Sequence, residues 1–235
     1  MTAAAIVDEL RTLGSDSYKK VLLNHGITEP VFGVKVAELK RFQKRLRKDY
    51  RLALDLYDTG IYDAMYLAGL IADESRMTKK DLRHWLARTN CDALCGSAVA
   101  WVTAESAHGW DLAREWIESK KEPVATAGWE TLASLTAVKD DADLDLPGFK
   151  QLLGRVERTI HAQPNRVRYA MNGFVIAVGT YFRDLSDLAV QTAERVGVVT
   201  VDVGDTSCTV PFAPDYIAKV RTRGGVGKKR KTARC

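Results

Sequence analysis

Residues 34–48 read VKVAELKRFQKRLRK, and this stretch decides the fold class. Apolar side chains recur at Val36, Leu39, Phe42 and Leu46, which is the spacing of one face of an α-helix. The same periodicity continues along most of the chain, in segments of about 10–16 residues joined by short turns. The 235 residues are 46% hydrophobic and 28% charged, a composition that can bury a globular core. The sequence therefore predicts an all-α fold.

The predicted helices recur in pairs along the chain. Such pairs are typical of a superhelical solenoid, in which each antiparallel pair buries one face against its neighbours. No strict sequence period is visible, so an irregular helical bundle is the alternative. We expect the solenoid to cover residues 1–222.

The C-terminal part of the chain departs from the helical pattern. Val199, Val201 and Val203 alternate with polar residues before a glycine turn, which predicts a short β-hairpin at about 198–211. A glycine-rich hinge and a run of basic residues follow. Residues 223–235 are therefore predicted to form a flexible basic tail.

Positive charge is concentrated at this end of the chain. The net charge is +5, yet residues 219–235 contain eight Lys or Arg and no acidic residue. The remainder has 27 basic against 30 acidic residues, a net charge of −3. Any binding of nucleic acid by the helical part must therefore depend on local clusters.

Membrane insertion, disulfides and metal binding are not indicated. No apolar run reaches the roughly 18–20 residues that cross a bilayer, and the N-terminus lacks the features of a signal peptide. We expect a cytosolic protein with no membrane partner. The cysteines lack the density of a disulfide framework and the spacing of a zinc site, so we expect reduced thiols, no metal and no cofactor. They are Cys91, Cys95, Cys208 and Cys235.

The outer face of the helix at 34–48 is strongly basic, with only Glu38 and Asp49 nearby as acidic partners. A cationic stripe of this kind neutralises phosphates and releases counterions, which gives affinity for DNA or RNA whatever its sequence. An ordinary solvated helix face is the alternative. The predicted nucleic-acid-binding residues here are Lys35, Lys40, Arg41, Lys44, Arg45, Arg47 and Lys48.

Two further clusters could contact nucleic acid. One opens a predicted helix whose N-cap is Asn165, and cations and an aromatic ring near a helix N-terminus suit a phosphate or a base. The other is the basic run of the tail, which could also bind an acidic protein. The first cluster consists of Arg166, Arg168, Tyr169 and Asn172, and the second of Lys228, Lys229, Arg230 and Lys231.

Three stretches carry a resemblance to a known family. They are FGVK at 32–35 leading into Leu39-Lys40, LALDLYDTG at 52–60, and YDA at 62–64 running on to LIAD at 70–73. In order and spacing the chain resembles the DNA alkylation repair family, the AlkD-like proteins built from HEAT-like helical repeats, to about residue 180.

The resemblance implies a curved solenoid of HEAT-like helix pairs whose concave face holds double-stranded DNA. Active members of the family are monofunctional glycosylases that release N3- or N7-alkylated purines. They hold the lesion without the usual base flipping, and an aspartate stabilises the cationic sugar. The resemblance thus implies a DNA-binding repair protein, which we expect to be a monomer.

One departure from the family concerns the catalytic position. The family's Trp-Asp-x-x-Asp motif aligns with residues 91–95, CDALC, so the catalytic aspartate falls on Cys95. Asp92 is then the leading replacement carboxylate, with the N-cap of a helix as its ordinary alternative role. If the protein is an enzyme, it is an alkylpurine DNA glycosylase using Asp92. The alternative function is a non-catalytic solenoid scaffold that binds nucleic acid or an acidic protein.

Overall fold

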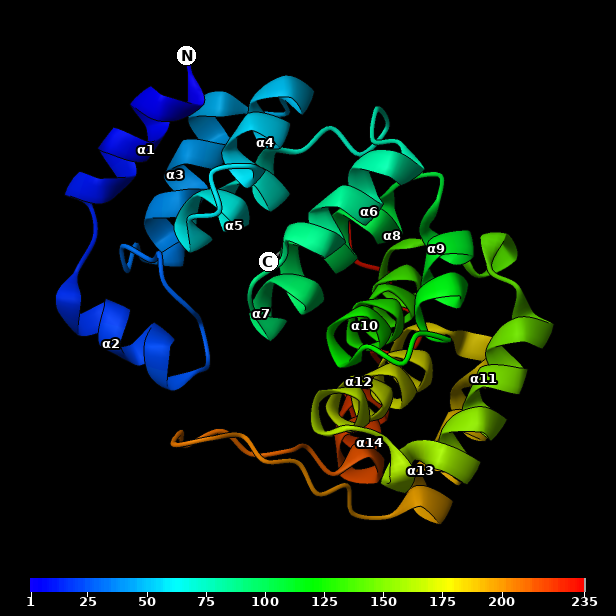
Figure 1. Ribbon diagram of the computed structural model, residues 1–235. Coiled ribbons are helices and arrows are strands. Elements are labelled where there is room, and N and C mark those ends of the chain that lie inside the picture. The colour runs from blue at the N-terminus through cyan, green and yellow to red at the C-terminus, as the bar shows by residue number, and fades with distance from the viewer. Residues whose placement is uncertain (235) are drawn as a thin grey trace. The chain divides into compact units, whose positions relative to one another are not determined.

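The computed structural model describes residues 1–234, and every regular element in them is a helix (Figure 1). These residues form two compact units. Unit 1 comprises Met1–His108 with Gly204–Thr206 and Arg234, and unit 2 comprises Gly109–Val203 and Ser207–Ala233. The predicted all-α class is therefore confirmed for the described part of the chain.

Unit 1 is built around α5, which contacts α1, α3, α4, α7 and the π-helical segment η1. All ten residues of α5 are buried. Gly69 allows one of these contacts, because a Cβ there would lie 2.6 Å from the Cβ of Ala98 in η1. The helices of unit 1 are α1 Ala3–Thr12, α2 Asp16–Asn24, α3 Val36–Leu46, α4 Tyr50–Tyr57, α5 Tyr62–Ile71, α6 Lys79–Arg88, α7 Asp92–Leu94, η1 Cys95–Val99 and α8 Ala100–Glu105.

The loop before α3 is fixed by a buried carboxylate of α5. Asp63 accepts the backbone N–H groups of Phe32 and Val34 at 2.6 and 2.8 Å. Gly33, between them, has a φ of +81°, and a Cβ there would lie 2.5 Å from the carbonyl oxygen of Ser15. These contacts determine where α3 begins.

Unit 2 has α12 at its centre, packed against α10, α13 and α14, and α10 also packs against α9. Aromatic rings fill the core: the ring of Phe174 lies 5.2 Å from that of Trp129 and 5.9 Å from that of Phe149. The helices of unit 2 are α9 Gly109–Trp116, α10 Glu122–Val138, η2 Asp141–Asp143, α11 Leu146–Thr159, η3 Ile160–Ala162, α12 Asn165–Tyr181, η4 Arg183–Leu185, α13 Ser186–Val196 and α14 Ala213–Thr222.

The β-hairpin predicted at about 198–211 is wrong, because no strand is assigned anywhere in residues 1–234. The alternating valines have another explanation. Val199 and Val201 are buried, and the backbone of Asp202 exchanges two hydrogen bonds with the side chain of Asn165 on α12. The segment is thus an extended loop that buries Val199 and Val201 without forming a sheet.

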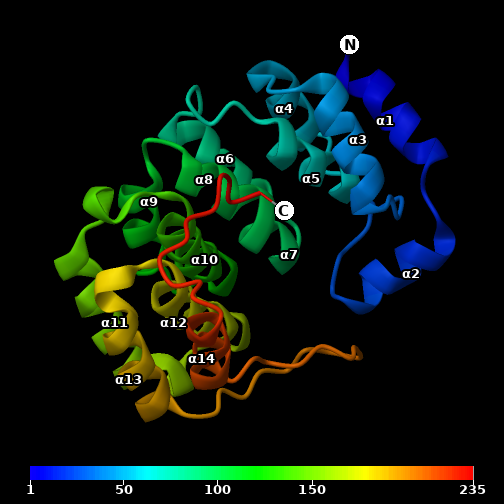
Figure 2. The same ribbon diagram turned by 180° about the vertical axis from the view of Figure 1, so that it is seen from behind.

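The segment after α14 has defined contacts along its length (Figure 2, in red). The N–H of Gly227 donates to the carbonyl of Thr180 at 2.9 Å, and the N–H of Arg230 to that of Ala137 at 2.7 Å. We call residues 224–234 the C-terminal strap. Cys235, which we expected to be a reduced thiol at the end of the basic tail, lies outside the described residues.

Candidate nucleic-acid interface

Helix α3 buries Leu39 and Phe42 against unit 1 and exposes its basic side. Lys40 and Lys44 are one turn apart on this outer side. All seven cationic residues predicted on this helix and its flanks are exposed: Lys35, Lys40, Arg41, Lys44, Arg45, Arg47 and Lys48. The structure therefore exposes every predicted cation of this helix and its flanks, and we call these seven residues the α3 face.

Three cations of the α3 face form ion pairs. Arg41 pairs with Glu38 at 2.8 Å, Arg45 pairs with Glu9 at 2.7 Å, and Lys48 pairs with Glu74. Glu9 and Glu74 are distant in sequence and were not expected as partners. Four cations have no ion pair with any residue between 1 and 234, namely Lys35, Lys40, Lys44 and Arg47. These four are available to phosphates.

The second predicted cluster lies on the first two turns of α12, in unit 2. The N-cap position is held by Pro164, so the prediction of Asn165 as N-cap is wrong; its amide instead binds the backbone of Asp202. The N–H of Arg166 donates to the carboxylate of Glu122 at 2.6 Å. One N–H at this helix end is therefore already occupied by a protein carboxylate.

The side chains of this cluster differ in exposure. Tyr169 is 38% exposed, whereas Asn172 is buried and donates its amide N–H to the carbonyl of Pro211 at 2.9 Å. Arg168 is partly buried, donates to Asn165 at 3.4 Å, and has a buried Nε without a partner in the described chain. Tyr169 is thus the member best placed to reach a ligand, and Asn172 has a positioning role.

Glu130 on α10 is a partly buried carboxylate that the sequence did not single out. Burial raises its pKa to about 7, and within residues 1–234 it has no hydrogen bond or ion pair. Burial also raises the pKa of Tyr169, and the charge of Glu130 adds to this effect. In the sequence, Glu130 could have been noticed only as an acidic residue directly after Trp129 in a largely apolar helix.

Glu130→Gln is expected to stabilise the protein at pH 8 but not at pH 5. The pKa is about 7 in the folded protein against an ordinary 4.5, so stability falls as pH rises through this interval. The neutral amide avoids that loss. Thermal midpoints at the two pH values measure it, with the exposed Glu194→Gln on α13 as control. A difference between Glu130→Gln and the native protein that is the same at both pH values would contradict the prediction.

The candidate catalytic segment lies at α7 and the start of η1. Asp92 is the first residue of α7 and is partly buried, while Cys91 holds the N-cap position, so the N-cap alternative for Asp92 is wrong. Cys95 is fully buried. Burial raises the pKa of the Cys91 thiol, which disfavours a thiolate there. None of Cys91, Cys95 and Cys208 forms a disulfide bond within the described residues.

The basic run at 228–231 lies on the C-terminal strap. Lys229 turns inward, forms an ion pair with Asp141 at 2.6 Å and donates to the carbonyl of Thr136 at 2.8 Å. Lys228, Arg230 and Lys231 are exposed. The structure thus uses one of these four cations internally and leaves three at the surface.

No group of three or more His, Cys, Asp or Glu side chains within residues 1–234 is arranged to hold a metal ion. None of the helices described here has the length and apolar character needed to span a membrane.

Comparison with known proteins identifies the family. The model of the family described as DNA alkylation repair enzyme matches residues 6–202. The chain belongs to this family. Two proteins similar to it in sequence are the uncharacterized proteins Lin0241 of Listeria innocua and Lmo0209 of Listeria monocytogenes. Each is 31% identical over 220 residues, which cover 92% of this chain and 95% of the relative.

A solved structure adds to this comparison. It is 35% identical, covers 100% of both chains and superposes with a TM-score of 0.92. It belongs to a family of proteins related to the HEAT-like repeat DNA glycosylases, with affinity for branched DNA structures. The predicted membership of the DNA alkylation repair family is therefore confirmed, and this family member shares its fold with a HEAT-like repeat protein.

Proposed function

We propose that this protein binds double-stranded DNA, and branched DNA more tightly than linear duplex, with the α3 face as a main contact surface. The observation that carries the proposal is the group of exposed cations on α3 that have no ion pair within residues 1–234. The structural neighbour with affinity for branched DNA supports the preference, since the two chains agree over their full lengths. We keep the expectation of a cytosolic monomer.

The electrostatics of α3 suit a phosphate backbone. Lys40 and Lys44 project from a helix whose opposite side packs against α5, so the backbone that carries them is fixed before binding. Such cations neutralise phosphates and release counterions, which gives salt-dependent affinity without reading the base sequence. A protein that recognises branching, in place of sequence, would need contacts of this kind.

The proposal is for binding, and base excision is not part of it. Where active members of the family are expected to have an aspartate, Cys95 is fully buried. A neutral thiol cannot stabilise a cationic sugar as a carboxylate does. Asp92 stays a predicted catalytic residue, and a scaffold for an acidic protein stays the alternative function.

A competition experiment tests the proposal. A labelled four-way DNA junction is bound to the protein, and unlabelled junction or linear duplex with the same number of phosphates competes, at about 0.1 M salt. We expect the junction to compete at about one-tenth the concentration of the duplex, a difference of about 1.4 kcal/mol. Equal competition would reject the preference for branches. If no DNA binds even at low salt, while an acidic protein is captured after nuclease treatment, the scaffold function is favoured.

A further inference from the structure

Among the Phe, Tyr and Trp side chains of residues 1–234, three are exposed at the surface. Tyr169 is 38% exposed, Phe212 is 41% exposed and Tyr216 is 49% exposed. All three belong to unit 2. Large apolar rings are normally buried, so rings that gather at the surface of one unit call for a ligand.

The three rings come from neighbouring segments. Phe212 is the N-cap residue of α14, and Tyr216 lies one turn further along the helix. Tyr169 lies one turn before Asn172, whose amide binds the carbonyl of Pro211, the residue preceding Phe212. The second turn of α12 and the start of α14 are therefore held together in unit 2.

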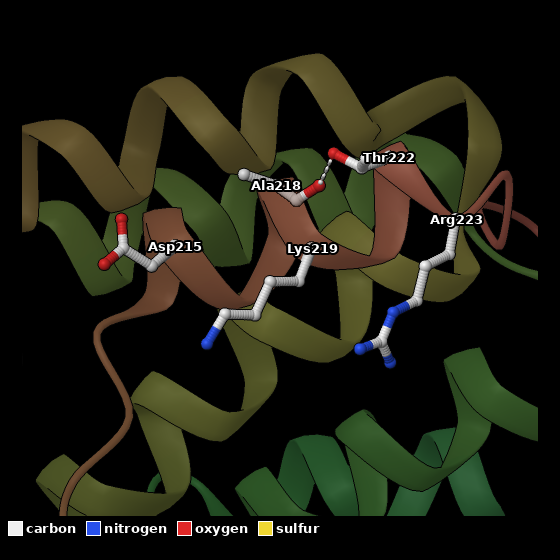
Figure 3. A pocket seen from close by; sticks show the side chains of 5 residues that line it. All are labelled: Asp215, Ala218, Lys219, Thr222 and Arg223. Carbon is white, nitrogen blue, oxygen red and sulfur yellow. Dashed lines mark hydrogen bonds between the residues drawn. The ribbon is translucent and has the colours of Figure 1, made fainter.

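Cations continue the same side of α14. Tyr216, Lys219 and Arg223 are spaced by three or four residues, which places them along one face of the helix, and Phe212 precedes them at its N-cap. Figure 3 shows the side chains of Lys219 and Arg223 extending to the same side of α14, beside a shallow pocket that Asp215 and Thr222 also line. Neither cation has an ion pair in residues 1–234. We call Phe212, Tyr216, Lys219 and Arg223 the α14 stripe.

The rest of α14 accounts for the stability of the helix, so the stripe is not needed for packing. Ile217 is fully buried against Gly179 of α12, where a Cβ would lie 2.5 Å from its side chain. Arg221 donates to Ser186 at 2.9 Å and to Asp187 at 2.7 Å, both on α13. These contacts fix the orientation of α14 about its own axis, so the α14 stripe faces away from the packed side of the helix.

We propose that the α14 stripe, together with Tyr169, binds single-stranded DNA. Exposed rings stack on the faces of unpaired bases, and interleaved Lys and Arg neutralise the accompanying phosphates. A duplex hides the faces of its bases within its own stack, so rings of this kind favour unpaired nucleotides. The inference goes beyond the proposed function, because it adds a second DNA ligand on unit 2, whereas the α3 face belongs to unit 1.

Paired substitutions separate stacking from general apolar contact. Phe212→Leu with Tyr216→Leu keeps the apolar area but removes both rings, whereas Phe212→Trp with Tyr216→Trp keeps rings at both positions. The probe is an oligothymidylate of about 15 nucleotides, which forms no duplex. We expect the leucine pair to weaken its binding about tenfold or more, the size of one or two lost stacking contacts. The tryptophan pair is expected to bind at least as well as the native protein, with quenched tryptophan fluorescence.

A second variant and a control complete the test. Lys219→Glu with Arg223→Glu is expected to weaken oligothymidylate binding by a similar factor, and Leu146→Ala with Val198→Ala, which removes exposed apolar area elsewhere in unit 2, is expected to leave it unchanged. The proposal is overturned if the native protein does not bind the oligonucleotide at low salt, or if the leucine pair binds it as tightly as the native protein. Binding of linear duplex, measured in parallel, reports on the α3 face, so either proposal can fail without the other.

Discussion

Arg234→Ala is expected to lower the free energy of unfolding by about 3–5 kcal/mol, the cost of removing one partner from a buried ion pair. The side chain of Arg234 is 5% exposed and pairs with Glu74 at 2.7 Å and with Glu105 at 2.9 Å. It also donates to the carbonyls of Leu70 and Ala72 at the end of α5. The substitution leaves two largely buried carboxylates without this cation. Urea denaturation, followed by circular dichroism, measures the loss.

Two companion variants make the Arg234 result specific. Arg230→Ala removes an exposed arginine from the same strap and is expected to change stability by less than about 0.5 kcal/mol. Arg234→Lys keeps the charge but cannot make all of the bonds, so an intermediate loss is expected. If Arg234→Ala unfolds at the same urea concentration as the native protein, the contacts of Arg234 do not contribute to stability as described.

The pH dependence of the Arg234 site has a defined sign. Burial alone raises the pKa of Glu74, but hydrogen bonding to Lys48 and the charges of Arg234 and Lys48 outweigh it and hold the pKa below its usual value. The native protein therefore gains stability from this carboxylate above its ordinary pKa and loses it as pH falls. In Arg234→Ala, the free energy of unfolding is therefore expected to decrease less than in the native protein as pH falls.

Lys40→Glu with Lys44→Glu is expected to weaken binding of both linear and branched DNA by about 100-fold at about 0.05 M salt. Neither cation has an ion pair in residues 1–234, so each is free to contact a phosphate, and each reversal adds repulsion to the lost attraction. The slope of log affinity against log salt concentration is expected to fall by about 2. Fluorescence anisotropy over a range of salt concentrations measures both quantities.

The matched control for the α3 variant is Lys80→Glu with Lys150→Glu. Both lysines are exposed, and they lie on α6 and α11, not on α3. Either double variant changes the net charge from +5 to +1, so overall charge is the same in both. An equal loss of affinity in the control would show that total charge, and not the α3 face, drives binding.

The helices themselves were readable from local patterns. The sequence predicted a helix at 34–48 with Leu39 and Phe42 inward, and the structure has α3 at Val36–Leu46 with both buried. The start of α6 is equally local, since Thr78 and Asp81, three residues apart, form a capping box there. Such features depend on residues within one or two turns, which is why sequence spacing reveals them.

The wrong predictions, the β-hairpin and the Asn165 N-cap, came from local patterns that are typical of one structure but occur here in another. Alternation of Val199 and Val201 with polar residues is typical of a strand, yet these valines are buried without any strand forming. Asn165 has the side chain of an N-cap, but a backbone distant in sequence uses it instead. In each case a long-range partner outweighed the local preference, and no single sequence displays such partners.

The sequence by itself determined that this protein is helical, that it belongs to the DNA alkylation repair family, and that α3 carries a basic face. Only the tertiary structure decided which cations are free. It paired Arg45 with Glu9 and buried Arg234 against Glu74, while Lys40 and Lys44 stayed exposed. Helix formation depends on neighbours three and four residues away, whereas charge pairing depends on residues up to 160 positions apart that meet only after folding.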